Sequence, residues 1–284
     1  RLSKTNTFSK CNKMKSIKLS SNHEIPVLGL GTWKLQGKIC AEAVKTAIKM
    51  GYTHIDTADA YDNHVEVGKG IKESGINRSK LFLTTKVWTT ELHYNEIIKN
   101  TERFLKELQT DYIDLLLIHW PNKEIPMEEP FKAFKELIKN KKVRSIGVSN
   151  FTISHLKEAK KISKVPIDIN QVEYHPYLNQ EDLLKYCKEN NIVITAYSPL
   201  ARGRVLQDPV LNEIAKTYNK TVSQLVLRWL FQKGLIVIPK ASSESHLKEN
   251  LEIFDFELKK EDIDKINSLD KKERFVNPGF SEFN

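Results

Sequence analysis

The chain has 284 residues, of which 40% are hydrophobic and 29% are charged, and its formal net charge is +9. No apolar run approaches the roughly 18 residues that a membrane helix needs, so the composition predicts a soluble globular protein and excludes a spanning helix. Residues 1–13 hold four of the positive charges and no acid, which leaves +5 for the rest, where Lys alternates with Glu. This dispersed charge argues against a nucleic-acid partner.

The first residues and the cysteines bear on where the protein works. The chain opens with Arg rather than Met, and residues 1–13 precede Met14 and the first predicted strand. We expect a disordered extension there; a transit peptide is the alternative, because Lys, Ser and Thr dominate without acids. Cys11, Cys40 and Cys187 are widely spaced and form no CxxC, which fits neither a disulfide framework nor a zinc site. We therefore expect a reducing, cytoplasmic location.

Short apolar segments recur along the chain after a predicted hairpin at residues 16–25. Eight of them are strand candidates, at residues 27–31, 53–56, 81–86, 112–119, 143–149, 167–172, 192–198 and 235–239. Segments with helical spacing lie between them, as at 97–108 and 131–138. Strands that are apolar through most of their length suit a parallel sheet buried on both faces, so the alternation predicts an α/β protein, a (β/α)8 TIM barrel. A doubly wound open sheet is the alternative.

The seventh interval between strands is longer than the others. Strand starts lie 24 to 31 residues apart until the last interval, which is 43 residues. The pattern predicts helices at 211–218 and 221–232 there, and extra helices after strand eight as well; in barrels this region often builds a phosphate site. No linker composition divides residues 14–284, which predicts a single barrel domain.

Polar residues end most of the predicted strands. They are Asp56, Lys86, His119, Ser149, Asn150, Gln171, Tyr197, Ser198 and Lys240. The active site of a (β/α)8 barrel forms at the carboxyl ends of its strands. Each residue alone could be a group that returns to solvent. Together, an Asp, a Lys and a His predict a catalytic cluster, because burying unpaired charges costs several kcal/mol.

The stretch from 51 to 68, GYTHIDTADAYDNHVEVG, could also be taken for a metal site. Its candidate ligands are His54, Asp56, Asp59, Asp62 and His64. A metal-dependent barrel hydrolase using His54, Asp56 and His119 would usually carry an HxH pair on one strand, and none occurs. We expect no metal: His54 lies in the core, Asp59 and Asp62 face water, and His64 lies at the surface.

Tyr61 lies five residues after Asp56 and suggests the chemistry. An acid that protonates a carbonyl oxygen while hydride reaches carbon must be a good donor, and free tyrosine, with a pKa of about 10, is a weak one. A nearby Lys86 ammonium would lower that pKa, and Asp56 would hold the lysine in place. His119 would orient the carbonyl or relay the proton.

Motifs in order along nearly the whole chain carry a family resemblance. They are IPVLGLGTW (25–33), GYTHIDTADAY (51–61), LTTKVW (83–88), DYIDLLLIHWP (111–121), IGVSNF (146–151), QVEYHP (171–176), AYSPL (196–200), IPK (238–240) and ENLEIFDFEL (249–258). With these motifs the chain resembles an aldo-keto reductase. The resemblance implies NADPH-dependent reduction of aldehydes and ketones, with Asp56, Tyr61, Lys86 and His119 as the catalytic tetrad.

The resemblance also implies a set of cofactor contacts. The nicotinamide would stack on Tyr197, its carboxamide would meet Ser149, Asn150 and Gln171, and further contacts would come from Gly31, Thr32, Trp33 and Asp56. The remaining contacts would be Ser198, Pro199, Leu200 and Arg202 at the pyrophosphate, Lys240, Ala241, Ser242 and His246 at the adenosine phosphate, and Glu249 and Asn250 at the adenine. No GxGxxG follows the first strand, because 29–34 reads GLGTWK, which argues against a Rossmann site.

One departure concerns the cofactor. Ala241 and His246 stand where the family usually has the serine and the arginine that hold the 2′-phosphate. His246 and Ser242 can still donate hydrogen bonds, and Lys240 remains, so we expect NADPH, with NADH as the alternative.

Aromatic residues near the strand ends suggest the substrate. Trp33, Trp88 and Trp120 would wall a pocket for apolar or aromatic carbonyls beside Tyr61 and His119, and the tail RFVNPGFSEFN (274–284) would close one side. Short loops resemble the branch of the family with diketogluconate, methylglyoxal and prostaglandin F synthase-like reductases, and an open pocket predicts broad tolerance. The resemblance suggests a monomer. A nucleotide-binding regulatory or scaffold subunit with little turnover is the alternative function.

Overall fold

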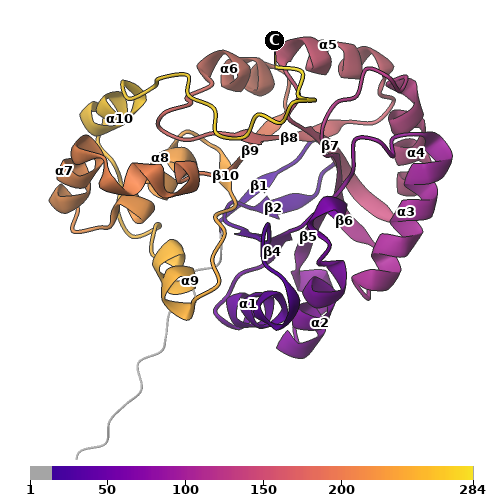
Figure 1. The fold of residues 1–284 in the computed structure, drawn as a ribbon, viewed down its shortest axis with the longest axis horizontal. Coiled ribbons are helices and arrows are strands. Elements are labelled where there is room, and N and C mark those ends of the chain that lie inside the picture. The colour runs from indigo at the N-terminus through magenta and orange to yellow at the C-terminus, as the bar shows by residue number, and fades with distance from the viewer. Residues whose placement is uncertain (1–14, 284) are drawn as a thin grey trace, which may run out of the picture.

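The structure, a computed structural model, describes residues 15–283. Eight parallel strands form one sheet in the order β10-β9-β8-β7-β6-β5-β4-β3. Their bounds are β3 Leu30–Gly31, β4 His54–Asp56, β5 Phe82–Val87, β6 Ile113–Ile118, β7 Val143–Ser149, β8 Ile167–Glu173, β9 Val193–Tyr197 and β10 Ile236–Val237. The strands form a central ring with helices around it (Figure 1), as the alternating pattern predicts.

The sheet closes on itself between its first and last strands. Val237 N–H donates to Val27 O, and Gly29 N–H donates to Val237 O, each at 2.9 Å. Parallel bridges join Leu28 to Val237 and Gly31 to Lys240. A Cβ on Gly31 would meet the carbonyl oxygen of Ile238 at 2.7 Å, so only glycine allows the two edges this close. The closed ring is the predicted barrel rather than an open sheet.

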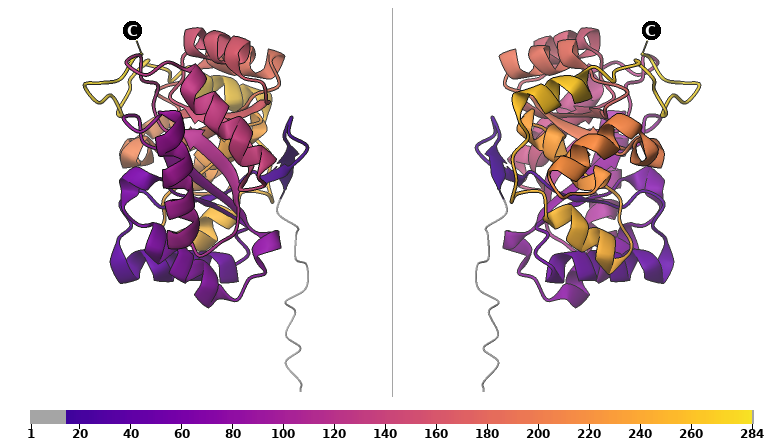
Figure 2. Two further views of the ribbon diagram at one scale, coloured as in Figure 1. Left: turned by 90° about the vertical axis from the view of Figure 1, so that its right-hand side faces the viewer. Right: turned by 90° about the vertical axis from the view of Figure 1, so that its left-hand side faces the viewer.

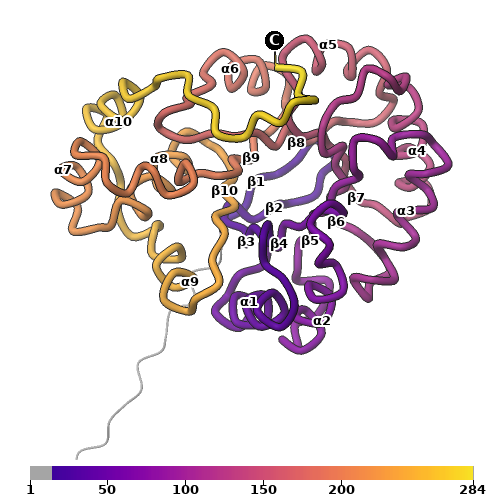
Figure 3. Tube along the Cα trace, viewed as in Figure 1, coloured from indigo at the N-terminus to yellow at the C-terminus, as the bar shows by residue number. Residues whose placement is uncertain are grey.

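Helices cover the outside of the ring and follow the strands in chain order (Figure 3). They are α1 Gly37–Lys49, α2 His64–Ser74, α3 Tyr94–Glu107, α4 Glu128–Lys139, α5 Ile153–Ile162 and α6 Glu181–Glu189. After the seventh barrel strand come α7 Pro209–Thr217 and α8 Val222–Gln232, and after the eighth come α9 Glu244–Leu251 and α10 Lys260–Asn267. Short 3-10 turns lie at η1 Asp59–Tyr61, η2 Arg78–Lys80 and η3 Ala201–Gln207. The extra helices match the prediction.

A hairpin lies across one end of the barrel. Its strands are β1 Ser16–Lys18 and β2 Glu24–Pro26, paired antiparallel as expected. The turn between them is fixed to the barrel because Ser21 N–H donates to the carboxylate of buried Asp168, at 2.9 Å. Figure 2 shows the hairpin and the C-terminal tail on opposite faces of the molecule. The face opposite the hairpin therefore holds the open end of the barrel.

The structure bears only in part on where the protein works. The expected extension at residues 1–13 lies outside the described residues. Between residues 15 and 283, no helix is long and apolar enough to cross a membrane. Cys40 and Cys187 are both free and buried.

Candidate active site

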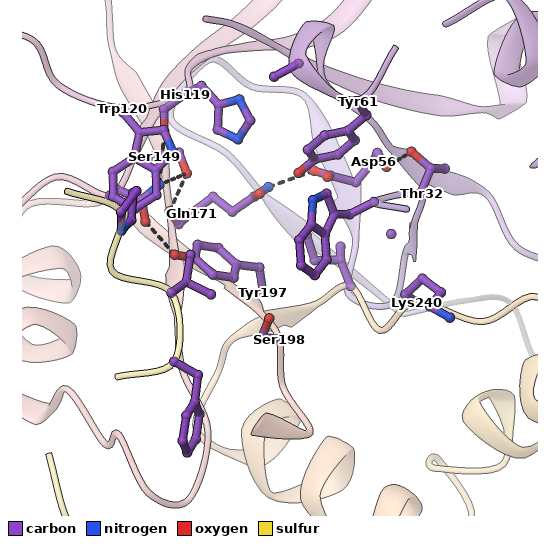
Figure 4. Close-up of a pocket in the computed structure, with 18 of the residues that line it drawn as sticks. Thr32, Asp56, Tyr61, His119, Trp120, Ser149, Gln171, Tyr197, Ser198 and Lys240 are labelled. Carbon is purple, nitrogen blue, oxygen red and sulfur yellow. Dashed lines mark hydrogen bonds between the residues drawn. The ribbon is translucent and has the colours of Figure 1, made fainter. Parts of the chain in front are cut away.

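A cleft of about 550 Å³ opens at the carboxyl ends of the barrel strands. Polar side chains from strand ends on several sides of the ring point into one space (Figure 4). The predicted site residues that line this cleft are Gly31, Thr32, Trp33, Asp56, Tyr61, Trp88, His119, Trp120, Ser149, Asn150, Gln171, Tyr197, Ser198, Pro199, Arg202 and Lys240. Most of the sequence-predicted set therefore comes together in three dimensions, as parallel strands require.

A buried lysine lies at the centre of the cluster. Lys86 is fully buried on β5, and its Nζ lies 2.6 Å from Asp56 Oδ1 and 2.8 Å from the carbonyl oxygen of Thr57. The same Nζ lies 3.4 Å from Tyr61 Oη, which η1 brings over the end of β4. An ammonium buried this deeply is tolerated because it is paired and hydrogen-bonded. Lys86 thus links the carboxylate to the phenol.

The pKa of Tyr61 differs from the expectation. Burial raises it well above its usual value, and the neighbouring Asp56 carboxylate raises it further. The expected lowering of the Tyr61 pKa was wrong. Lys86 pairs with Asp56 at 2.6 Å and lies farther from Tyr61 Oη, at 3.4 Å, and burial lowers the pKa of the lysine itself despite its partner. Tyr61 therefore keeps its proton at neutral pH, which is the form that can donate.

His119 follows β6 and faces the same cleft. Burial lowers its pKa well below the usual value, and the Lys86 charge lowers it further, so the imidazole is neutral. Its ring meets Tyr61 and Trp88 edge to face, with centroids 5.7 and 5.2 Å apart. Nδ1 has no hydrogen-bond partner between residues 15 and 283. The ring is held by packing and keeps hydrogen-bonding capacity free.

Amide groups line the opposite wall. Gln171 on β8 donates through Nε2 to Asp56 Oδ2 at 2.7 Å, so both carboxylate oxygens of Asp56 are engaged. Asn150 donates to the carbonyl oxygen of His119 at 3.0 Å and accepts from Tyr197 Oη at 2.7 Å. Ser149 donates to the carbonyl oxygen of Gln171 at 2.8 Å. These bonds fix Tyr197 and the amides as one wall.

Positive side chains lie at another side of the cleft, beside the loop after β9. Arg202 and Lys240 both line it. Ser198, Ala201 and Arg202 have positive φ angles of 47°, 49° and 54°, which turn this loop sharply before α7. Six predicted cofactor residues do not line the cleft, namely Leu200, Ala241, Ser242, His246, Glu249 and Asn250.

Three of those six have other observed environments. Asn250 is buried, and Glu249 accepts a hydrogen bond from Thr221 Oγ1. His246 is exposed at the start of α9, where its N–H donates to Ser243 Oγ. Of the six, Ser242 and His246 are exposed and therefore open to a ligand outside the cleft.

The substrate side of the cleft is aromatic. Trp120 is nearly buried, and Trp33 is 39% exposed at the rim. Phe280 from the tail lies edge to face on both Trp88 and Trp120, with centroids 5.7 and 5.6 Å away. The tail lines one side of the cleft, as expected, through Phe275, Val276, Asn277, Pro278 and Phe280. Two further lining residues, Ala60 and Ile238, were not among the predicted site residues.

The histidines and outer aspartates of the 51–68 stretch go to different places. His64 was expected at the surface, but it is 4% exposed, and its ring nitrogens lie 2.8 Å from Thr85 Oγ1 and 3.1 Å from Glu107 Oε2. In the first turn of α2, the polar His64 points inward and the apolar Val65 is 57% exposed, which is the opposite of what their polarities predict. Asp59 was expected to face water, but it pairs with Arg103 at 2.8 Å.

His54 and Asp56 do not act together as ligands. His54 is buried in the core as predicted, with Nε2 3.1 Å from Thr84 Oγ1 and its ring edge to face with Phe82. Asp56 is occupied by Lys86 and Gln171. Within residues 15–283, no group of three or more His, Cys, Asp or Glu side chains could hold a metal ion.

The donor set fits a nicotinamide nucleotide. Hydrogen-bonding amides suit a carboxamide, the Tyr197 ring suits a flat heterocycle, and Arg202 with Lys240 suits phosphate charge. The tetrad beside them contains a protonated phenol and a neutral imidazole, which suit a carbonyl oxygen. A barrel with this site belongs to the class of nicotinamide-dependent oxidoreductases.

Comparison with known proteins agrees. A family model, described as the Aldo/keto reductase family, matches residues 27–271. A glyoxal reductase of Bacillus subtilis (strain 168) is 46% identical over 260 residues, which cover 91% of this chain and 94% of that protein. A crystal structure of a putative 2,5-diketo-D-gluconic acid reductase B superposes with a TM-score of 0.92 at 41% identity, covering 95% of this chain and 97% of the other.

A third relative bears on the cofactor. The Bombyx mori aldo-keto reductase, solved in complex with NADP, superposes with a TM-score of 0.88 at 33% identity and covers 94% of this chain and 96% of its own. The chain belongs to the aldo/keto reductase family. It is an enzyme that reduces carbonyl compounds with a nicotinamide cofactor.

Proposed function

We propose that the protein reduces aldehydes and ketones to alcohols with NADPH, and that Tyr61 is the general acid. The observation that carries this proposal is the buried chain from Asp56 through Lys86 to Tyr61 Oη, at 2.6 and 3.4 Å. The reductase relatives favour this function over a regulatory or scaffold role.

Each member of the tetrad has a distinct task. When bound, the reduced nicotinamide supplies the hydride. Tyr61 Oη gives its proton to the carbonyl oxygen as negative charge develops there, and Lys86 stabilises the phenolate left behind. Asp56 keeps Lys86 charged and in place. Neutral His119 donates a hydrogen bond that orients the carbonyl oxygen next to Tyr61.

The same chain would hold the cofactor with residues around the cleft. Ser149, Asn150 and Gln171 would meet the carboxamide, and Tyr197 would stack on the ring. Gly31, Thr32 and Trp33 border the same space, and Ser198, Pro199 and Arg202 would meet the pyrophosphate. Gln171 would have to share its amide with Asp56, to which it now donates.

The preference for NADPH rests on one lysine and two hydrogen-bond donors. Lys240 and the exposed His246 would meet the 2′-phosphate, with Ser242 as a further donor. Ala241 is buried and offers no hydroxyl, so this grip is weaker than the family pattern implies and some use of NADH follows. Leu200, Glu249 and Asn250 would complete the nucleotide site.

The substrate class follows from the aromatic wall. An aromatic wall favours apolar and aromatic aldehydes, and here it is formed by Trp33, Trp88, Trp120 and Phe280. The similarity to a glyoxal reductase suggests small dicarbonyl compounds as further substrates. We also propose that the enzyme is a cytoplasmic monomer; the free, buried Cys40 and Cys187 support the reducing compartment, and the monomer rests on the family resemblance. Light scattering on a sizing column would test the assembly.

The test is a panel of aldehydes that includes glyoxal, methylglyoxal and benzaldehyde. We expect loss of the reduced-nicotinamide absorbance with several of them, faster with NADPH than with NADH. Chelator should leave the rates unchanged. If no carbonyl compound consumes either cofactor, the proposed function is wrong.

A further inference from the structure

Glu173 is a buried carboxylate outside the tetrad that the proposed chemistry does not use. It ends β8, two residues after Gln171, and it is fully buried. Burying a carboxylate is costly unless it receives hydrogen bonds, so its partners indicate its role. Two of those partners are backbone amides of the tail, 102 and 103 residues away along the chain.

Backbone N–H groups of the C-terminal tail, residues 274–283, donate hydrogen bonds to this carboxylate. Phe275 N–H donates to Glu173 Oε1 at 2.9 Å, and Val276 N–H donates to Oε2 at 3.0 Å. His175 Nε2 lies 3.1 Å from Oε1. Burial by itself would raise the pKa of Glu173, but these three hydrogen bonds lower it below the usual value, so the carboxyl is ionised. Each oxygen thus holds one tail amide with a charge-assisted bond.

Side chains around Glu173 hold the same part of the tail. The rings of His175 and Phe275 stack with centroids 5.2 Å apart, and the Arg204 guanidinium lies 4.6 Å from the centre of the Phe275 ring. The Gln180 amide donates to the carbonyl oxygen of Glu173 at 2.7 Å. The tail is therefore fixed at residues 275 and 276, where it begins to line the cleft.

Beyond this anchor the tail forms part of the cleft wall. Val276, Asn277, Pro278 and Phe280 line it, and Phe280 lies against Trp88 and Trp120 while remaining 47% exposed. The two ring contacts leave Phe280 half exposed, so its place also depends on the backbone on either side, which Glu173 anchors at residues 275 and 276 and Glu282 anchors through Lys123 N–H and His155.

We propose that Glu173 is a positioning residue for substrate selectivity: its carboxylate fixes the tail backbone so that Phe280 stays against the Trp88 and Trp120 rings and completes the aromatic wall. This inference rests on the proposed carbonyl reduction. It concerns how the wall is held, and it leaves the proton donor unchanged. A large aromatic aldehyde uses the wall, whereas a small aldehyde touches little of it.

The test compares Glu173→Gln with a matched control. Gln keeps the shape but turns an NH2 group toward one of the two tail amides, so one bond is lost and two donors face each other. Asp114→Asn is the control, because Asp114 is also buried and accepts a backbone N–H, from Leu83 at 3.0 Å, but lies at the amino end of β6, away from the cleft. Both variants are assayed well below their melting temperatures.

For Glu173→Gln we expect the KM for benzaldehyde to rise about tenfold, the change that corresponds to one lost charge-assisted bond. The KM for propanal and the kcat for both aldehydes should change less than about twofold. Asp114→Asn should lower the melting temperature without changing the ratio of the two KM values. In a Phe280→Ala background, Glu173→Gln should add no further change to that ratio.

A readout independent of turnover separates this inference from the proposed function. Hydrogen exchange of the peptide that contains Phe275 and Val276 should quicken in Glu173→Gln and stay as in the unmodified protein in Asp114→Asn. Equal rises in both KM values, an unchanged benzaldehyde KM, or unchanged tail exchange would overturn the positioning role. An unmodified enzyme that reduces no aldehyde would instead refute the proposed function, and the exchange result would still decide whether Glu173 holds the tail.

Discussion

The two ends of the barrel use the same kinds of buried charge in different ways. At the amino ends of the strands, which we call the base, Asp114 accepts from Leu83 N–H and pairs with Arg78 at 2.7 Å and Arg144 at 3.2 Å. At the carboxyl ends, which we call the mouth, His119 Nδ1 has no partner within residues 15–283, and Tyr61 Oη has only the 3.4 Å contact with Lys86.

The difference separates stability from function. Asp114 and its two arginines at the base satisfy one another, so their removal should cost folding free energy and leave the chemistry intact. Polar groups at the mouth keep unused hydrogen-bonding capacity beside open volume, which is what a site for a reacting group needs. The following changes test that division from the largest expected effect to the smallest.

Of the four changes that test this division, Lys86→Met at the mouth should have the largest effect. It removes the charge 3.4 Å from Tyr61 Oη and leaves Asp56 with Gln171 as its remaining side-chain partner. We expect kcat/KM to fall about 10³-fold, as for loss of a transition-state electrostatic contact. Steady-state assays with benzaldehyde measure this, and circular dichroism checks that the variant is folded. A fall below tenfold would show that the lysine is not needed.

Arg78→Ala at the base should give the opposite result. Arg78 donates to Leu81 O, Tyr112 O and Asp114 and is the link between η2 and the starts of β5 and β6. Its loss leaves buried Asp114 with only Arg144 as an ion pair, so we expect about 3 kcal/mol less stability. Urea unfolding measures the stability. The kcat/KM of the folded variant should stay within about twofold, and a larger loss would contradict the division between base and mouth.

The buried His54 should make the protein sensitive to acid. Burial is the main cause that lowers the pKa of His54 to about 4, from a usual value of 6.5. Because its folded-state pKa is depressed, the unfolded chain binds the proton first, so stability is lost as pH falls from 6.5 toward 4. We expect a loss of about 3 kcal/mol from this residue. His54→Gln should flatten the slope of unfolding free energy against pH; an unchanged slope would assign the loss to other groups.

His246→Arg should have the smallest effect, and only on the cofactor. His246 is exposed at the start of α9 and lies outside the cleft that holds the tetrad. An arginine there can bind the 2′-phosphate with two hydrogen bonds, so the Kd for NADPH should fall about tenfold while that for NADH stays constant. Fluorescence titration with both cofactors measures this. Equal tightening of both would contradict the assignment.

The sequence predicts the mouth well for a physical reason. Parallel strands buried on both faces are apolar runs, so a polar residue that ends such a run must lie at one rim of the barrel. Asp56, Lys86 and His119 are found by this rule alone. The family resemblance adds predicted cofactor contacts. Those predicted for the nicotinamide line the cleft, whereas Leu200 and those predicted for the adenine do not.

Other features depend on contacts that no local pattern records. His64 is polar and buried while Val65 is apolar and exposed, because Thr85 and Glu107 supply partners from β5 and α3. The raised pKa of Tyr61 depends on its burial in the folded chain and on the nearby Asp56 carboxylate. Such effects need the folded structure.

The hydrogen bonds between Glu173 and the tail also depend on the folded structure, since the residues that they join are far apart in the chain. A buried acid in a strand that ends at the mouth was the only available signal, and it does not say which segment returns to meet it.

The most direct test of the central claim is Tyr61→Phe, assayed for turnover and for NADPH binding in the same preparation. The variant loses one oxygen and keeps the ring that packs against His119. We predict that turnover falls at least about 10³-fold because the proton donor is gone, while the Kd for NADPH changes less than about twofold. Near-normal turnover, or a parallel loss of NADPH binding, would contradict the assignment of Tyr61 as the acid.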